Sequence, residues 1–135
     1  MNLLGVLKGT ELEKHVEQSL EAEIRAVGMY HALAYLAKRK GYTEVATTLE
    51  NIASDEARHA GLYSILNGHV QDDIFTTLTH VAKLESGAVA KIQEFAQAVR
   101  GLGLDQAAQE INATGKDEER HGLLLQALVE QYGNA

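Results

Sequence analysis

The chain has 135 residues with no cysteine and no proline, which suits one domain over residues 1–135 and excludes a disulfide framework, a thiolate metal site or an iron–sulfur cluster. The formal net charge of −7 argues against a nucleic-acid partner. No stretch approaches the roughly 18 apolar residues of a membrane span, and the opening MNLLGVLKG lacks the features of a signal peptide. We therefore expect no membrane partner and a cytoplasmic location.

Four long helices are predicted, because helix-forming residues are abundant and apolar side chains recur at spacings of three and four. Glycines mark the breaks between them: Gly41 ends the first helix, Asn67 and Gly68 end the second, and Gly101 and Gly103 precede the last. The predicted ranges are 10–39, 43–66, 73–100 and 105–132.

Polar residues stand where three of these helices should begin. Thr10 and Glu13 have the spacing of a capping box for the first helix. Asp72 or Asp73 can cap the third helix, and Asp105 can cap the fourth. The sequence therefore predicts side-chain caps at the first, third and fourth helices.

The polar residues of the predicted helices occur twice, at a fixed offset of 62 positions. Each copy is a Glu, then 31 residues, then the sequence Asp-Glu-x-Arg-His. Each copy also spans two predicted helices, which indicates hairpin repeats over 10–67 and 72–132. The two sets are Glu23, Asp55, Glu56, Arg58 and His59, and Glu85, Asp117, Glu118, Arg120 and His121.

Three residues of each copy are candidate metal ligands. Glu56 and His59 stand three residues apart on one helix face, and Glu23 lies on the apolar stripe of the neighbouring helix. With the second copy, the full set is Glu23, Glu56, His59, Glu85, Glu118 and His121. Four carboxylates and two imidazoles suit two ions of iron or manganese and make a tetrahedral zinc site unsuitable.

The alternative interpretation is that these residues are surface charges on amphipathic helices. It is disfavoured because all six lie on the apolar stripes, where an unpaired carboxylate costs several kcal/mol. Four clustered carboxylates would also repel one another unless cations lie between them. The sequence therefore predicts a dinuclear metal site inside a helical bundle.

The repeated pattern resembles the ferritin-like di-iron carboxylate proteins. The segment from Glu23 to Tyr30 and the turn Lys40-Gly41-Tyr42 look most like the rubrerythrin branch, and the resemblance covers about 12–130. It implies an all-α, ferritin-like four-helix bundle with two iron ions per site, although manganese or a mixed iron–manganese pair also fits the ligands. It further implies that Glu56 and Glu118 bridge the ions.

The resemblance assigns the remaining roles as well. Glu23 and Glu85 would be terminal ligands, and His59 and His121 would each bind one ion. Two aspartates look like acids that orient the ligating histidines, and we pair them across the repeat, Asp55 with His121 and Asp117 with His59. The alternative for both aspartates is a solvated helix position.

Three further residues next to the ligands have expected roles. Tyr30 is where the family places a tyrosine near the metals, so it is a candidate catalytic residue, with simple core packing as the alternative. Arg58 and Arg120 lie off the apolar stripes, so we expect each to form a salt bridge to a neighbouring helix.

The implied activity is that of a non-haem di-iron peroxidase or oxidase. It would reduce hydrogen peroxide or dioxygen with electrons from an external protein such as a rubredoxin, because the sequence contains no four-cysteine rubredoxin domain. Rubrerythrins carry a seventh carboxylate where this chain has Ala88, which weakens the peroxide assignment. The alternatives are a ferroxidase for iron storage or detoxification and an oxygenase of an organic substrate.

The connection between the two repeats predicts how the bundle assembles. A single-chain bundle of this symmetry needs the second and third helices parallel, so the chain must cross a gap of about 33 Å. Residues 67–72 reach about 24 Å when fully extended. We therefore expect a homodimer in which two chains exchange hairpins, with each site taking ligands from both.

Overall fold

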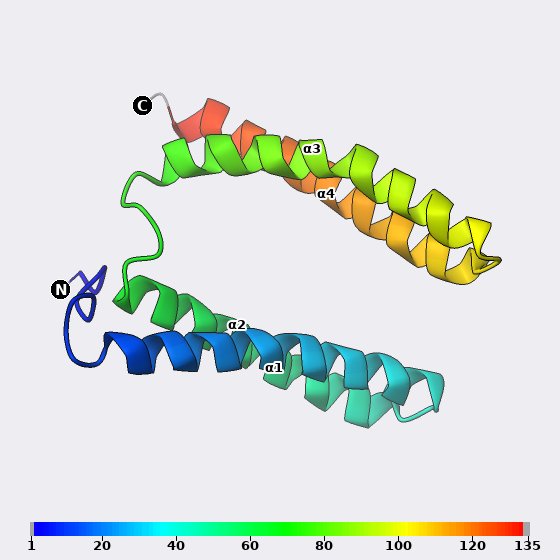
Figure 1. The fold of residues 1–135 in the computed structure, drawn as a ribbon, viewed down its shortest axis with the longest axis horizontal. Coiled ribbons are helices and arrows are strands. Elements are labelled where there is room, and N and C mark those ends of the chain that lie inside the picture. Colours follow the sequence, from blue (N-terminus) through cyan, green and yellow to red (C-terminus); the bar gives the residue numbers. More distant parts are fainter. Residues whose placement is uncertain (1, 134–135) are drawn as a thin grey trace. The chain divides into compact units, whose positions relative to one another are not determined.

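A computed structural model describes residues 2–133, and within them the chain forms four helices and no strand (Figure 1). The predicted all-α class is confirmed. The first helix begins three residues later than predicted, and the third helix begins and ends one residue later. The helices are α1 (Glu13–Arg39), α2 (Thr43–Leu66), α3 (Ile74–Gly101) and α4 (Asp105–Tyr132).

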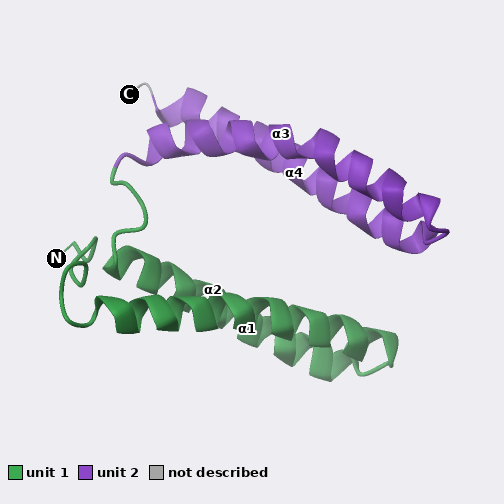
Figure 2. Ribbon diagram, viewed as in Figure 1, with its two compact units in different colours: residues 1–72 green, residues 73–135 purple. Residues whose placement is uncertain are grey.

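The chain divides into two compact units, Met1–Asp72 and Asp73–Ala135 (Figure 2). In the first unit α1 packs along α2, and in the second unit α3 packs along α4. Each unit is a helical hairpin with a short turn, which makes its two helices antiparallel neighbours (Figure 1). Among the described residues, no helix is both long and apolar enough to cross a membrane.

The turns of the two hairpins share one backbone geometry. Gly41 follows α1 with φ of +83°, and the next amide, of Tyr42, donates to the carbonyl of Ala37 at 2.8 Å. Gly103 has φ of +79°, and the amide of Leu104 donates to the carbonyl of Val99 at 3.4 Å. A glycine tolerates this left-handed conformation, and the following amide satisfies a carbonyl of the last helical turn.

The third helix has the predicted side-chain cap. The amide of Thr76 donates to Oδ1 of Asp73 at 3.1 Å, and the hydroxyl of Thr76 donates to Oδ2 at 2.6 Å. These bonds stabilise the ionised carboxylate, and the hydroxyl of Thr76 is the main reason that the pKa of Asp73 is lowered. Asp73 is therefore the residue that begins α3.

The predicted caps at the first and fourth helices are wrong. The hydroxyl of Thr10 donates to the carbonyl of Leu7 at 2.7 Å and accepts from the amide of Leu12 at 3.2 Å, so the hydroxyl belongs to a local turn before α1. The cap position of α4 is Leu104, which leaves Asp105 as the first helical residue. There its charge still complements the positive end of the helix dipole.

Small side chains fill the seam between the helices of each hairpin. In the first unit Ala34, Ala46 and Ala53 are at most 2% exposed, and in the second unit Ala96 and Ala108 are fully buried. Many large apolar side chains of the described chain stay exposed to solvent, among them Phe95 at 58%, Leu124 at 56% and Leu36 at 50%. One hairpin alone therefore buries small residues well and leaves many of its larger apolar residues uncovered.

Candidate metal centre

The predicted ligands of the first unit come together through helical periodicity and hairpin packing. Glu56 and His59 lie one turn apart on α2, and α1 supplies Glu23 opposite them. One ligand atom from each residue lies within 4.8 Å of the others. Nδ1 of His59 is 3.6 Å from Oε2 of Glu23 and 3.9 Å from Oε2 of Glu56.

The second unit contains an equivalent group. Glu118 and His121 lie one turn apart on α4, and α3 supplies Glu85. Nδ1 of His121 is 3.6 Å from Oε2 of Glu85, the distance found for the corresponding pair in the first unit. The structure therefore brings the six predicted ligands into two groups of three, one in each hairpin.

The carboxylates of Glu23 and Glu85 have unmet bonding capacity. Oε2 of each is buried and has no hydrogen-bond partner among the described residues. These side chains are 19% and 25% exposed, while the imidazoles of His59 and His121 remain 45% and 44% exposed. A buried anionic oxygen without a partner is unfavourable, and a cation bound between the carboxylate and the imidazole would satisfy it. The residues present therefore fit a metal ion.

The two carboxylates of the first group interact with each other. The pKa of Glu56 is raised, chiefly by a hydrogen bond shared with Glu23 and further by burial and by the charge of that neighbour. Two carboxylates this close repel each other when both are ionised, and this repulsion favours the protonated form of Glu56. A divalent cation bound between the two carboxylates would relieve this repulsion, so the arrangement is suited to binding metal.

Four charged residues beside the ligands form ion pairs within their own helices. Nη1 of Arg58 is 3.3 Å from Oδ1 of Asp55, and Nη2 of Arg120 is 3.4 Å from Oδ1 of Asp117. The expected bridges from the arginines to neighbouring helices are therefore wrong, because a spacing of three residues already brings each guanidinium to a carboxylate. The pairings of Asp55 with His121 and of Asp117 with His59 join different hairpins and stay predictions.

Two features of the first unit were hard to predict from sequence: the environment of Tyr30 and a polar network at the end of α2. Tyr30 is partly buried on α1, two turns beyond the first ligand, and its catalytic role stays a prediction. Asn67, one of the residues predicted to end α2, is only 3% exposed and bonds to Glu17, which also contacts His69. Glu17 and Asn67 lie 50 residues apart and have no repeated counterparts, so no sequence pattern connects them.

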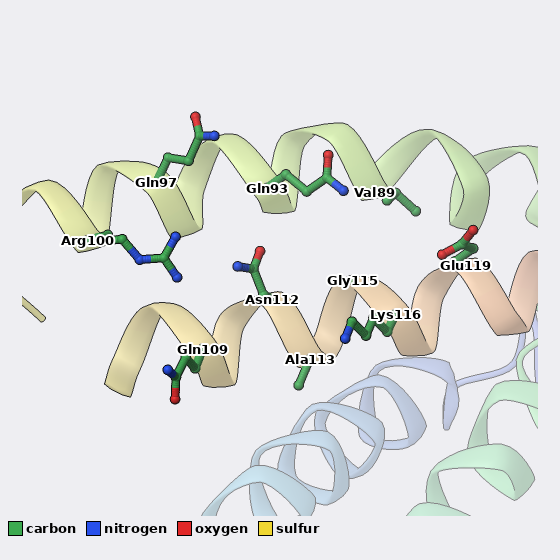
Figure 3. Close-up of a pocket in the computed structure, with 10 residues that line it drawn as sticks. All are labelled: Val89, Gln93, Gln97, Arg100, Gln109, Asn112, Ala113, Gly115, Lys116 and Glu119. Carbon is green, nitrogen blue, oxygen red and sulfur yellow. The ribbon is translucent and has the colours of Figure 1, made fainter. Parts of the chain in front are cut away.

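A groove lies between α3 and α4 of the second unit (Figure 3). Its cavity volume is about 580 Å³, and none of the six predicted ligands lines it. Arg100 and Asn112 face it, whereas the repeat positions Lys38 and Glu50 of the first hairpin form an ion pair. Its other lining residues are Val89, Gln93, Gln97, Gln109, Ala113, Gly115, Lys116 and Glu119. The groove is thus separate from the ligand group.

Comparison with known proteins identifies the family of the chain. The sequence model of the rubrerythrin family matches residues 14–129. The chain belongs to the rubrerythrin family. Reverse rubrerythrin-1 of Clostridium acetobutylicum is 37% identical over 134 residues, which cover 96% of this chain and 73% of that rubrerythrin. The uncharacterized protein MJ0746 of Methanocaldococcus jannaschii is 36% identical over 129 residues, which cover 96% of this chain and 92% of that protein.

Membership of the rubrerythrin family confirms the predicted ferritin-like helical class and indicates a di-iron oxidoreductase. The two carboxylate and histidine groups are the places in the described chain where such ions could be held. The identity of the ions, the oxidant and the electron donor are matters of proposal.

Proposed function

We propose that this protein is a di-iron peroxidase that reduces hydrogen peroxide, or dioxygen in its place, with electrons from an external protein such as a rubredoxin. The observation that carries the proposal is the pair of equivalent groups, each with a buried carboxylate oxygen 3.6 Å from an imidazole nitrogen and without a hydrogen-bond partner in the described chain. The family supports iron as the metal, and manganese or a mixed pair would fit the same ligands.

The proposed ligand roles follow the chemistry of each side chain. By resemblance to the di-iron carboxylate proteins, Glu56 and Glu118, each one turn before a histidine, would bridge the two ions. Glu23 and Glu85 would be terminal ligands, and His59 and His121 would bind one ion each. Two bound ferrous ions would supply the two electrons that convert hydrogen peroxide and two protons into two water molecules.

The side chains of the site also set its charge balance and the orientation of its histidines. Before metal binds, the hydrogen bond with Glu23 and the charge of that neighbour raise the pKa of Glu56, which favours the protonated form of Glu56. When cations bind, the negative charge of the carboxylates would offset most of the positive charge of the ions. In each histidine, the ring nitrogen that does not bind metal would need a hydrogen-bond acceptor. We propose Asp117 as the acceptor for His59 and Asp55 as the acceptor for His121.

A homodimer with exchanged hairpins is the assembly that we propose. From Glu56 to Leu66, and again from Ile74 to Glu85, a helix advances about 15 to 16 Å, so one chain would have to cross about 31 Å to build a site alone. Residues 67–73 reach about 27 Å when fully extended. The exposed apolar residues, such as Phe95 at 58%, also require a covering partner.

Peroxide turnover with matched variants tests the proposal. The iron-loaded protein should consume one peroxide for every two electrons drawn from reduced rubredoxin. The double variant Glu23→Gln with Glu85→Gln should lose at least tenfold in rate, while Glu21→Gln, an exposed position on the same helix, should not change it. Equal rates in the double variant and in Glu21→Gln would contradict the assigned site. Faster reduction of dioxygen than of peroxide would identify the protein as an oxidase.

A further inference from the structure

The end of α2 is attached to α1 and to the N-terminal segment by a set of contacts confined to the first hairpin. We propose that these contacts form a clasp, made of Glu17, Asn67, His69 and the backbone of 5–7, that shortens the free connection and so forces the hairpins to pair between chains. This inference rests on the exchanged dimer proposed above, and it assigns to the clasp the control of that exchange.

Asn67 is the buried part of the clasp. At 3% exposure it needs hydrogen-bond partners, and its Nδ2 donates to the carbonyl of Glu13 at 3.0 Å and to Oε1 of Glu17 at 2.8 Å. Both acceptors belong to α1. The first residue after α2 is therefore held against the neighbouring helix.

His69 extends the attachment two residues further along the connection. Its Nε2 contacts Oε1 of Glu17, the same oxygen that accepts from Asn67. Through these contacts the chain is held on α1 as far as residue 69, so only residues 70–73 remain free before α3 begins.

The N-terminal segment holds the last turn of α2 from another direction. The amide of Gly5 donates to the carbonyl of Ile65 at 2.8 Å, and the amide of Leu7 donates to the carbonyl of Leu66 at 2.9 Å. The carbonyls of a last helical turn have no partner within their own helix, so these bonds stabilise that turn against unwinding. The backbones of Gly5 and Gly68 meet closely, and a Cβ at position 68 would lie 3.3 Å from Cα of Gly5.

The second hairpin folds without such a clasp. The positions 62 residues after Glu17, Asn67 and His69 are occupied by Thr79, Val129 and Gln131, which cannot reproduce the network. A helical hairpin of this type therefore does not need the clasp for its own formation. The first hairpin differs in one respect: the connection between the two hairpins begins at the end of its second helix.

The reach of the connection shows what the clasp changes. With the clasp closed, residues 70–73 span about 17 Å, far less than the 31 Å or so that a single-chain site requires. Once the clasp is open and the amides of Gly68 and His69 have left the carbonyls of Ile65 and Ser64, residues 67–73 span about 27 Å. Each α2 residue that unwinds then reduces the remaining shortfall by about 5 Å. Unwinding of one residue would then let one chain close on itself. Lengthening a hinge in this way favours the monomer over the exchanged dimer.

Dilution of clasp variants, followed by light scattering after size exclusion, tests the proposal. We expect the full-length wild type to remain a dimer. His69→Ala, at an exposed residue, should raise the dimer dissociation constant several-fold, and Asn67→Ala should raise it at least tenfold and yield a monomer that binds two irons. Gln131→Ala, at the repeat position of His69, should change nothing. Unchanged dissociation in both clasp variants, with the helical circular dichroism signal retained, would overturn the inference.

An insertion variant separates failure of the clasp from failure of the exchange. Insertion of six Gly and Ser residues after Gln71 adds about 20 Å of reach and leaves the clasp intact. If the insertion produces monomers and the clasp variants do not, exchange stands and the clasp is refuted. If the wild type is already a monomer with two irons, exchange and clasp are both refuted, while peroxide turnover still decides the proposed activity. Should Asn67→Ala lose its helical signal, His69→Ala decides the question.

Discussion

Replacing Gly122 by alanine should destabilise the second hairpin and weaken its metal site. Gly122 is buried on the α3–α4 seam, next to the proposed ligand His121. A Cβ built there would overlap Oγ of Ser86 and lie 3.3 Å from the carbonyl oxygen of Ala82. Ser86 can rotate away, but the backbone of Ala82 can relieve the contact only if the two helices separate by a few tenths of an ångström.

The expected size follows from two opposing effects. Overpacking of a tight interior costs about 1–3 kcal/mol, whereas replacing a helical glycine by alanine gains about 1 kcal/mol in helix propensity. Gly122→Ala should therefore lower the free energy of unfolding by about 1 kcal/mol. Gly61→Ala is the matched control, because a Cβ at Gly61 meets nothing within 4 Å, and it should raise that free energy by up to about 1 kcal/mol.

Urea unfolding of the metal-free variants at one protein concentration, followed by circular dichroism, measures this difference. Adding Ser86→Ala to Gly122→Ala should restore part of the loss, since one of the two contacts disappears. Separation of the helices should also move Glu85 away from His121, so Fe(II) affinity should fall in Gly122→Ala and not in Gly61→Ala. Equal stabilisation by the two glycine replacements would refute the tight seam and the spacing argument built on it.

Three further predictions concern the ends of the helices. Asp73→Ala should cost about 1 kcal/mol of stability in chemical unfolding because α3 loses its cap, and Asp72→Ala should cost little. Gly41→Ala should destabilise by about 1–2 kcal/mol, because φ of +83° strains any residue with a Cβ, and an unaffected unfolding midpoint would contradict this. The pKa of Glu17 is lowered below its usual 4.5, first by Asn67 and then by His69, so the carboxylate adds stability above pH 4.5 that is lost as the pH falls through the lowered pKa. Acid titration of Glu17→Gln should show a shallower loss of stability in that range than the wild type.

The helices and the two ligand groups were predictable because both depend on local periodicity. A spacing of three residues fixes Glu56 beside His59, and the hairpin turn at Gly41 then places α1 and its Glu23 alongside. Because the sequence pattern repeats, the same reasoning applies to the second unit. These features need only the pitch of a helix and a short turn, so the chain sequence determines them directly.

The features that were missed depend on competition among polar groups. Thr10 could have capped α1, but its hydroxyl bonds to the turn formed by Leu7 and Leu12. Arg58 could have formed a salt bridge to a neighbouring helix, but Asp55 on its own helix is already within 3.3 Å. The bonds of Asn67 span 50 residues or more and obey no repeat. Composition and spacing do not decide between alternative partners of this kind.

The most direct test of a dinuclear site built from both hairpins is an anaerobic Fe(II) titration of the metal-free protein, with the mass of the complex determined in the same samples. Binding should saturate at two irons per chain in a dimer, and Glu23→Gln alone should weaken both ions, because its carboxylate and those of the other hairpin share one site. Saturation at no iron or at one iron per chain would contradict the dinuclear site, and binding of many more would indicate iron storage in its place.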